Sequence, residues 1–295
     1  MEIEKLDEGL STLMKEAWKV RQQNFSNSIE FDIPKNTMVI SLTGQQCSLN
    51  CAHCGGHYLK GMATIEDGKN QCLLNKYTSC LISGGCNKQG VVEFNNNMKF
   101  IQYLRDKSKK INMHIGLVDE EQIKMISDLV DCVSFDFVAD EETIKEVYGL
   151  SKDTKHYIET YKSLRKYTKV IPHICIGLKG GQVKGEYETL KILKDIGVDG
   201  LVFIIFIPTP DTTYQDRKPP KLEEILKLLA KARIDFPDVP IHLGCMRPKG
   251  KIRANIDYYA VQCGVNKIVN PTKYGIKSAE ELGLEIKYGE ECCVL

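Results

Sequence analysis

The sequence predicts an α/β fold, and in particular a TIM-like (β/α)8 barrel. Eight short apolar segments of strand length alternate with segments whose apolar residues recur at helical spacing. This alternation implies parallel strands joined by right-handed crossovers, and 295 residues are enough for one barrel of eight such units. The strand bodies are apolar, whereas thiols, a carboxylate and a guanidinium lie at the predicted carboxyl ends, where barrels carry their active sites. A doubly wound open sheet is the alternative, because periodicity does not separate the two folds.

Each element of the predicted barrel follows from a local pattern. An N-terminal helix over 7–25 is predicted from the helical spacing of Leu10, Met14 and Trp18, and Pro34 separates it from the barrel. The predicted strands are 38–42, 80–83, 111–118, 132–138, 170–178, 200–207, 241–244 and 267–269. The predicted helices between them are 96–108, 119–130, 155–167, 186–196, 221–234 and 253–261.

We expect one domain over 1–295, with the barrel core over 38–270 and a short C-terminal extension over 271–295. The longest apolar run, 201–208, is too short to cross a membrane, and the N-terminus lacks the apolar core of a signal peptide. A net charge of +1 gives no sign of a nucleic-acid surface. These properties predict a soluble, cytoplasmic protein with neither nucleic acid nor membrane as a partner.

Twelve cysteines are many for such a chain, and three of them predict a metal cluster. Cys47, Cys51 and Cys54 follow the first predicted strand with the spacing Cys-x3-Cys-x2-Cys. Three thiolates can hold three irons of a [4Fe-4S] cubane and leave the fourth iron open to a small molecule, whereas four cysteines close the cluster. A zinc site is the alternative, with His53 or His57 as the fourth ligand, although zinc ligands more often come in two separated pairs.

The segment 47–54, called the cysteine loop below, resembles the cluster-binding loop of the radical S-adenosylmethionine superfamily. The segments that resemble the biotin synthase branch are 14–25, 172–186 and 207–212. The segments that look more like the two-component, archaeal-type lipoyl synthases are 81–85, 134–140 and 244–250. The resemblance implies that S-adenosylmethionine chelates the open iron and is cleaved to a 5′-deoxyadenosyl radical, which abstracts a hydrogen from an unactivated carbon.

The resemblance also implies residues that bind S-adenosylmethionine. Gly84 and Gly85 match the glycine pair that meets the methionyl amino group, with Cys86 where an acidic residue is common. Asp136 is the candidate for the ribose hydroxyls, because a carboxylate can accept from two of them. The candidates for contact with adenine are Cys175, Ile204 and Ile207. An ordinary turn, a solvent-side carboxylate and two buried strands would explain the same residues without a ligand.

Sulfur-inserting relatives hold a second cluster that is consumed as the sulfur donor, so the resemblance implies further ligands. The candidates are Cys80, Cys86, Cys245, Cys292 and Cys293. Cys80, Cys175 and Cys245 match strand positions of the second-cluster ligands in biotin synthase. The fourth ligand there is an arginine, for which Arg247 and Arg253 are available.

The sequence assigns no catalytic residue beyond candidates. His114 and His173, on the third and fifth predicted strands, are candidates for substrate contact or proton transfer, and Arg247 for a substrate carboxylate. Satisfied barrel histidines and a solvated loop cation are the alternatives. Cys132 and Cys263 lie in apolar settings and are expected to be buried small hydrophobes.

The resemblance favours sulfur insertion into an octanoyl chain on a lipoyl-domain lysine, as one component of a lipoyl synthase. It implies three partners: a second radical S-adenosylmethionine subunit, a lipoyl-domain carrier protein, and a reductant such as ferredoxin or flavodoxin. One alternative is a single-cluster radical enzyme that rearranges or methylates a small molecule. Another is an iron–sulfur redox sensor or scaffold that does not cleave S-adenosylmethionine.

Overall fold

The computed structural model of the chain describes residues 3–107 and 109–295. Within these residues, ten parallel strands form one curled sheet in the order β10-β1-β9-β8-β7-β6-β5-β4-β3-β2. The strands are β1 Ser28–Asp32, β2 Thr37–Ser41, β3 Ser79–Ser83, β4 Lys110–Met113, β5 Cys132–Asp136, β6 Val170–Ile176, β7 Leu201–Ile205, β8 Ile241–Leu243, β9 Lys267–Val269 and β10 Glu285–Gly289.

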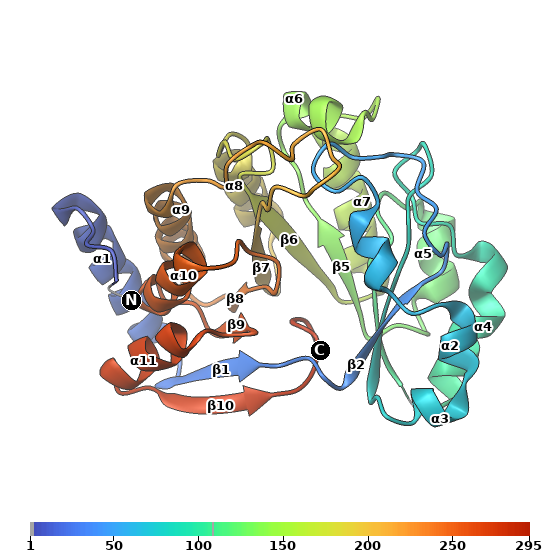
Figure 1. The fold of residues 1–295 in the computed structure, drawn as a ribbon, viewed down its shortest axis with the longest axis horizontal. Coiled ribbons are helices and arrows are strands. Elements are labelled where there is room, and N and C mark those ends of the chain that lie inside the picture. Colours follow the sequence, from blue (N-terminus) through green and yellow to red (C-terminus); the bar gives the residue numbers. More distant parts are fainter. Residues whose placement is uncertain (1–2, 108) are drawn as a thin grey trace.

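Helices cover the outer side of the curved sheet, and the C-terminus lies inside the curve (Figure 1). The α-helices are α1 Glu8–Asn24, α2 Ile65–Lys69, α3 Gln71–Leu74, α4 Met98–Asp106, α5 Glu120–Ile126, α6 Glu141–Thr143, α7 Thr154–Tyr167, α8 Glu186–Ile196, α9 Leu222–Asp235, α10 Lys251–Gln262 and α11 Lys273–Glu281. Three shorter helices are η1 His57–Gly61, η2 Asn95–Asn97 and η3 Ile144–Tyr148. The first, α1, packs on α9 beside the barrel.

The structure confirms the predicted parallel α/β fold of the barrel type, but the barrel has two more strands than predicted and is not closed. All eight predicted strands are present, as β2 to β9, but β1 and β10 were not predicted. In the described part of the chain, the outermost strands β10 and β2 do not pair, so the sheet is a half-barrel with an open side. The extension 271–295 was expected to be a short tail; instead it contains α11 and β10, and β10 pairs with β1 along its whole length.

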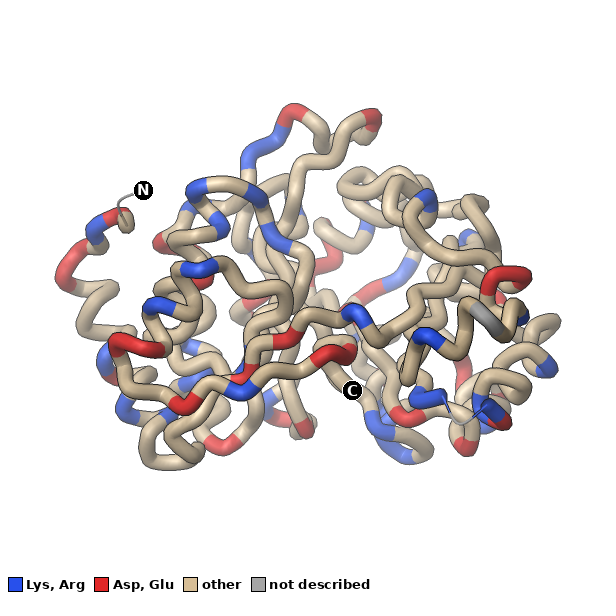
Figure 2. The backbone as a smooth tube through the Cα atoms, turned by 60° about the horizontal axis from the view of Figure 1, so that its bottom comes forward, with Lys and Arg blue, Asp and Glu red and all other residues tan. Residues whose placement is uncertain are grey.

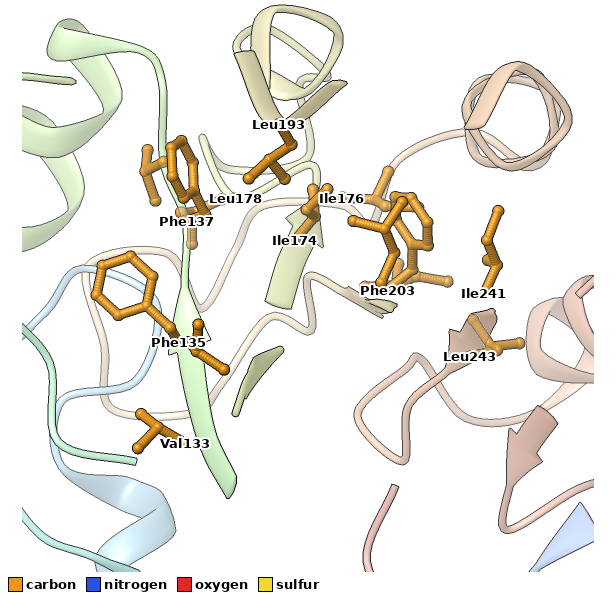
Figure 3. Packing of buried hydrophobic residues seen from close by; sticks show 14 of the residues in the cluster. Val133, Phe135, Phe137, Ile174, Ile176, Leu178, Leu193, Phe203, Ile241 and Leu243 are labelled. Carbon is orange, nitrogen blue, oxygen red and sulfur yellow. The ribbon is translucent and has the colours of Figure 1, made fainter. Parts of the chain in front are cut away.

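The outer face of the sheet and the helices form the main hydrophobic core. Phe135, Ile174 and Phe203 point from neighbouring strands toward the helix layer, and Leu193 of α8 points back toward the sheet (Figure 3). Each of these side chains is at most 1% exposed. Burial of an apolar side chain of this size contributes about 1.5–3 kcal/mol, so this layer fixes the half-barrel on which any site is built.

The inner face of the sheet surrounds a lumen lined by polar side chains and thiols. Because successive side chains of a strand alternate between faces, paired residues on neighbouring strands share one face. One register row runs inward across six strands, from β5 through β6, β7, β8 and β9 to β1. Its members are Asp136, His173, Val202, His242, Lys267 and Glu30. The lumen is therefore not a packed apolar interior.

The last residues of the chain turn from β10 into this lumen. Cys293 and Val294 are 8% and 7% exposed and belong to a second apolar cluster that includes Val202 and Val269 of the inner face. The partners in this contact are distant along the chain, so no local pattern identifies them. The tail closes the end of the lumen at which β2 and β3 begin, as the hydrogen bond from Cys292 N to Thr37 Oγ1 indicates (2.9 Å).

Basic and acidic residues alternate over the surface elements of the molecule (Figure 2). This mixture accords with the net charge of +1. No helix among the described residues is both long and apolar enough to cross a membrane.

Candidate functional site

The cysteine loop leaves the carboxyl end of β2 and is held by three separate parts of the chain. Ser48 N donates to the carbonyl of Cys86, 2.8 Å away, beyond β3. Ala52 N donates to the carbonyl of Val147 in η3 (2.8 Å), and the Ala52 carbonyl accepts from Tyr214 N (2.9 Å). These backbone bonds fix the loop over the carboxyl end of the half-barrel, where the strand ends of such folds meet.

Gly84 and Gly85 form the seat of the loop. Gly85 N donates to Thr43 Oγ1 at 2.7 Å, and a Cβ atom on Gly85 would lie 1.9 Å from the Gln46 carbonyl oxygen and 2.6 Å from the Cys47 Cα. The close approach that glycine permits is therefore made, in this structure, by the cysteine loop itself. A cradle that only glycine can form holds the first cysteine in place.

The three thiols suit an iron–sulfur cluster as a donor set. The hydrogen bond between the Cys51 and Cys54 thiols lowers the pKa of Cys54 to about 7 and raises the pKa of Cys51, so Cys54 reaches the ligating thiolate form more readily than Cys51. In residues 3–107 and 109–295, no three His, Cys, Asp or Glu side chains already converge on one point. Each thiolate of a cubane binds a different iron, so a cluster does not require that convergence.

Among the described residues, neither of the two histidines offered for a zinc site forms a metal-binding group with the thiols. The ring of His53 meets Tyr148 edge-on at 5.8 Å, and its buried Nδ1 atom has no hydrogen-bond partner. Burial lowers the pKa of His53 to about 4, so the ring is neutral near pH 7. His57 is exposed and stacks edge-on with Tyr58. An unpaired, buried ring nitrogen beside the cysteine loop indicates room for a polar ligand there.

Asp136 forms a charge pair with His114 inside the lumen. His114 Nε2 lies 3.2 Å from Asp136 Oδ2. Burial alone would raise the pKa of Asp136, but His114, and more weakly His173 and His53, outweigh it and lower that pKa to about 2. Burial opposes protonation of His114, but the charge and hydrogen bond of Asp136 raise the pKa of His114 above its usual value.

This pair faces open space although it lies deep in the molecule. The side chains of His114 and Asp136 are 35% and 40% exposed, and the surface that is exposed belongs to the lumen. The second oxygen of Asp136 can thus accept from a ligand while the first accepts from His114. His173 lies next in the row, with its ring stacked on His114 at 6.3 Å.

The candidates for contact with adenine lie at the carboxyl ends of β6 and β7. Cys175 and Ile204 are register partners on the lumen side and are partly exposed, as is Ile207 just beyond β7. Tyr58 and Thr209 share a hydrogen bond of 3.0 Å above them, which links the segment after the cysteine loop to the segment after β7. The structure therefore brings these candidates to the same mouth as the cysteine loop.

Arg247 does not have the role suggested for it from sequence. Its guanidinium is fully buried and donates from Nε to Asp257 Oδ1 at 2.7 Å. It also donates from Nη1 to the carbonyls of Gly244 and Val269 (2.6 and 2.8 Å) and from Nη2 to the Asn270 carbonyl (3.1 Å). A guanidinium bound in this way has no free fork for a substrate carboxylate, so Arg247 fixes the turn after β8.

The structure also separates the cysteines proposed for a second cluster. Cys80 is fully buried on the outer face of β3, among the helix-facing hydrophobic residues, so it cannot reach the lumen. Cys86 lies beside the cysteine loop and is within electrostatic reach of Cys47. The three that remain are within electrostatic reach of one another: Cys245, which follows β8, and Cys292 and Cys293 of the tail.

Cys132 and Cys263, expected to be small hydrophobes, are both buried, but only Cys263 lies in the helix layer. Cys132 lies on the lumen side, in the cluster that receives the tail. Sequence reasoning missed two lumen residues, His242 and Lys267. His242 alternates with apolar neighbours in its strand Ile-His-Leu, a signal that could have found it, whereas Lys267 opens the run Lys-Ile-Val and has no such signal.

Comparisons with known proteins agree with this architecture. No protein-family model matches the chain. It is 24% identical over 254 residues to the biotin synthase of Sulfurihydrogenibium sp. (strain YO3AOP1), covering 80% of this chain and 73% of that protein. It is 22% identical over 256 residues to the biotin synthase of Persephonella marina (strain DSM 14350 / EX-H1), covering 80% and 72%.

Among solved structures, the fold is similar to that of methylornithine synthase (PylB), with a TM-score of 0.69 and 16% identity over 96% of this chain and 90% of that one. It is also similar to HydG, a maturase of the [FeFe]-hydrogenase, with a TM-score of 0.70 and 15% identity over 96% and 69%. At such identities these structures establish the likeness of the fold.

Proposed function

We propose that this chain is a radical S-adenosylmethionine enzyme whose [4Fe-4S] cluster is held by Cys47, Cys51 and Cys54. The observation that carries the proposal is the seat of the cysteine loop. The loop lies against Gly85 with no space for a Cβ atom, at the mouth of a lumen that contains the Asp136–His114 pair. When bound, the cluster and S-adenosylmethionine supply reductive cleavage to a 5′-deoxyadenosyl radical.

The chain's own residues position the cofactor and shield the reaction. The backbone at Gly84, next to the seat, is available to the methionyl end of S-adenosylmethionine, as its place in the superfamily pattern implies. Asp136 is ionised at neutral pH because its pKa is about 2, so it can accept hydrogen bonds from both ribose hydroxyls. Ile204 and Ile207 offer apolar surface for the adenine ring at the same mouth.

We further propose that the reaction is sulfur insertion into an octanoyl chain carried on a lipoyl-domain lysine. Its supports are the resemblance of segments 81–85, 134–140 and 244–250 and the thiols at the far end of the lumen. In this proposal the partners are a second radical S-adenosylmethionine subunit, the lipoyl-domain carrier, and a ferredoxin or flavodoxin as reductant. The sulfur would come from a second iron–sulfur cluster, for which Cys80 is no longer a candidate.

The test is formation of 5′-deoxyadenosine by the anaerobically reconstituted and reduced protein. The variant Cys47→Ala/Cys51→Ala/Cys54→Ala should lose its activity, whereas Cys263→Ala, which removes a buried thiol of the helix layer, should retain it. A wild-type protein that holds iron but forms no 5′-deoxyadenosine would overturn the proposal in favour of a sensor or scaffold. Octanoyl-lysyl peptide should gain sulfur by mass spectrometry; cleavage of S-adenosylmethionine without that gain would reject sulfur insertion alone.

A further inference from the structure

The C-terminal tail, residues 290–295, brings two thiols to an imidazole inside the lumen. Cys292 Sγ lies 3.8 Å from Cys293 Sγ, and Cys293 Sγ lies 3.6 Å from His173 Nε2. A tetrahedral site with bonds of about 2.3 Å to sulfur and about 2.0–2.1 Å to nitrogen has edges of about 3.8 Å between sulfurs and about 3.6 Å between sulfur and nitrogen. Both separations therefore match edges of one metal-binding tetrahedron.

The imidazole presents the correct nitrogen for a metal. His173 Nδ1 lies 3.1 Å from the Ile171 carbonyl oxygen, which can only accept, so the proton is on Nδ1 and Nε2 carries a lone pair. That lone pair faces Cys293 Sγ. Histidines that bind metals commonly donate their other ring N–H to a backbone carbonyl in this way, which fixes both the tautomer and the ring orientation.

Polar contacts from several strands hold the tail in this position. Glu291 accepts hydrogen bonds from the hydroxyls of Thr78 and Ser79 at the start of β3. Thr37 Oγ1 accepts from Cys292 N at 2.9 Å, and His242 Nδ1 donates to the Cys293 carbonyl at 2.9 Å. These contacts fix the backbone on both sides of the two thiols, so the positions of Cys292 and Cys293 in the lumen are set by specific polar partners.

Cys245 is placed to complete the set. It follows β8, is exposed to the lumen, and is within electrostatic reach of both Cys292 and Cys293. Because no three such side chains of the described residues already converge, binding requires the two tail thiols, His173 and Cys245 to draw closer together.

We propose that Cys292, Cys293 and His173, with Cys245, form a thiolate-ligated metal centre distinct from the cysteine loop. The same ligands would suit a zinc ion or the irons of a sulfide-bridged cluster, because both take thiolate and imidazole. Binding releases the thiol protons to solvent and consumes no other reagent. The proposal does not depend on the first cluster, and only its iron–sulfide form would serve sulfur insertion.

The test uses the full chain with Cys47→Ala/Cys51→Ala/Cys54→Ala, which removes the first set of thiols. The reduced protein is loaded with Zn²⁺ in one arm and with iron and sulfide in the other, and bound metal is measured per chain after desalting. Co²⁺ titration adds a spectroscopic measurement, the thiolate-to-cobalt charge-transfer absorption. We expect about one zinc or one cluster per chain and a charge-transfer band on cobalt binding.

Adding Cys292→Ser/Cys293→Ser should abolish the band and the bound metal, and adding His173→Gln should weaken binding at least tenfold. Val294→Ala loosens the packing of the tail without removing a ligand, and Cys263→Ser removes a thiol of the helix layer; both should keep the metal. Zinc alone, or iron with sulfide, would each support the site and identify its metal. No metal in either arm, or metal that persists in the Cys292→Ser/Cys293→Ser background, would overturn it, whether or not the wild-type chain cleaves S-adenosylmethionine.

Discussion

Replacement of Gly85 by alanine should displace the cysteine loop without unfolding the half-barrel. The new Cβ would lie 1.9 Å from the Gln46 carbonyl oxygen, whereas ordinary contact begins at 3.4 Å, so that oxygen must move by about 1.5 Å. The clash is with backbone, which has no rotamer to change. The Gln46 carbonyl also accepts from Thr43 Oγ1 at 3.0 Å, and Thr43 in turn accepts from Gly85 N, so the whole seat must move.

Overpacking of this kind costs about 1–3 kcal/mol. For a chain of this size, each kcal/mol lowers the melting temperature by about 2–4 °C or less. Gly61→Ala is the matched control, because a Cβ atom there meets nothing within 4 Å and the residue ends η1, the short helix that follows the cysteine loop. We expect Gly85→Ala to melt a few degrees below Gly61→Ala and to retain less than half of its iron after anaerobic reconstitution.

The assays are differential scanning calorimetry of the apoprotein and iron content of the reconstituted protein. An unchanged melting temperature together with full iron content in Gly85→Ala would show that the loop is not seated on this glycine, and would refute the reasoning. A lower melting temperature with full iron content would show that Gly85→Ala destabilises the protein without disturbing the cluster ligands, and would refute the link between Gly85 and the cluster.

Three further predictions concern the fold. Arg247→Met leaves its buried carboxylate partner unpaired and should lower the free energy of unfolding by about 3–5 kcal/mol in urea titrations; a loss below about 1 kcal/mol would contradict the assigned role. Burial lowers the pKa values of His173 and His242 to about 4, so the unfolded chain binds more protons between pH 6.5 and 4. Stability should therefore fall as the pH is lowered through that window, and glutamine at both positions should flatten the slope in urea midpoints. Phe203→Ala, in the outer core, should cost about 3–5 kcal/mol, more than Ile204→Ala on the lumen side, as chemical denaturation would measure.

The interior strands could be predicted from sequence because both of their faces are buried. Strands such as β7, Leu201–Ile205, are continuous apolar runs, and turns or helices bound them clearly. The strand β10, Glu285–Gly289, has a single neighbour and no buried residue, and Tyr288 is 66% exposed, so its sequence resembles a surface loop. The strand β1 alternates apolar and acidic residues and could have been found, but it is short and lies close to a proline.

Site residues could be predicted where a motif defines them by its spacing. They could not be predicted where the role of a residue depends on the direction in which its side chain points. The three-cysteine spacing and the glycine pair required no knowledge of the fold. The direction of Cys80 did require it, because in a strand buried on both faces the apolar pattern does not reveal which residues face the lumen. The structural role of Arg247 depends on Asp257, ten residues further along the chain, and on the Val269 carbonyl of β9. No local sequence pattern identifies either partner.

The open half-barrel explains why sulfur ligands lie on two segments at opposite ends of one lumen. A closed barrel fills its own interior, whereas here the sheet leaves both ends to be covered by loops. The cysteine loop covers the carboxyl end and the tail covers the other, and each cover carries thiols. His173 connects them, since its ring stacks on His114, the partner of Asp136, while its Nε2 faces Cys293. A metal bound at Nε2 would hold the His173 ring in place, and His173 stacks on His114, so the two ends of the lumen would be linked through this ring contact.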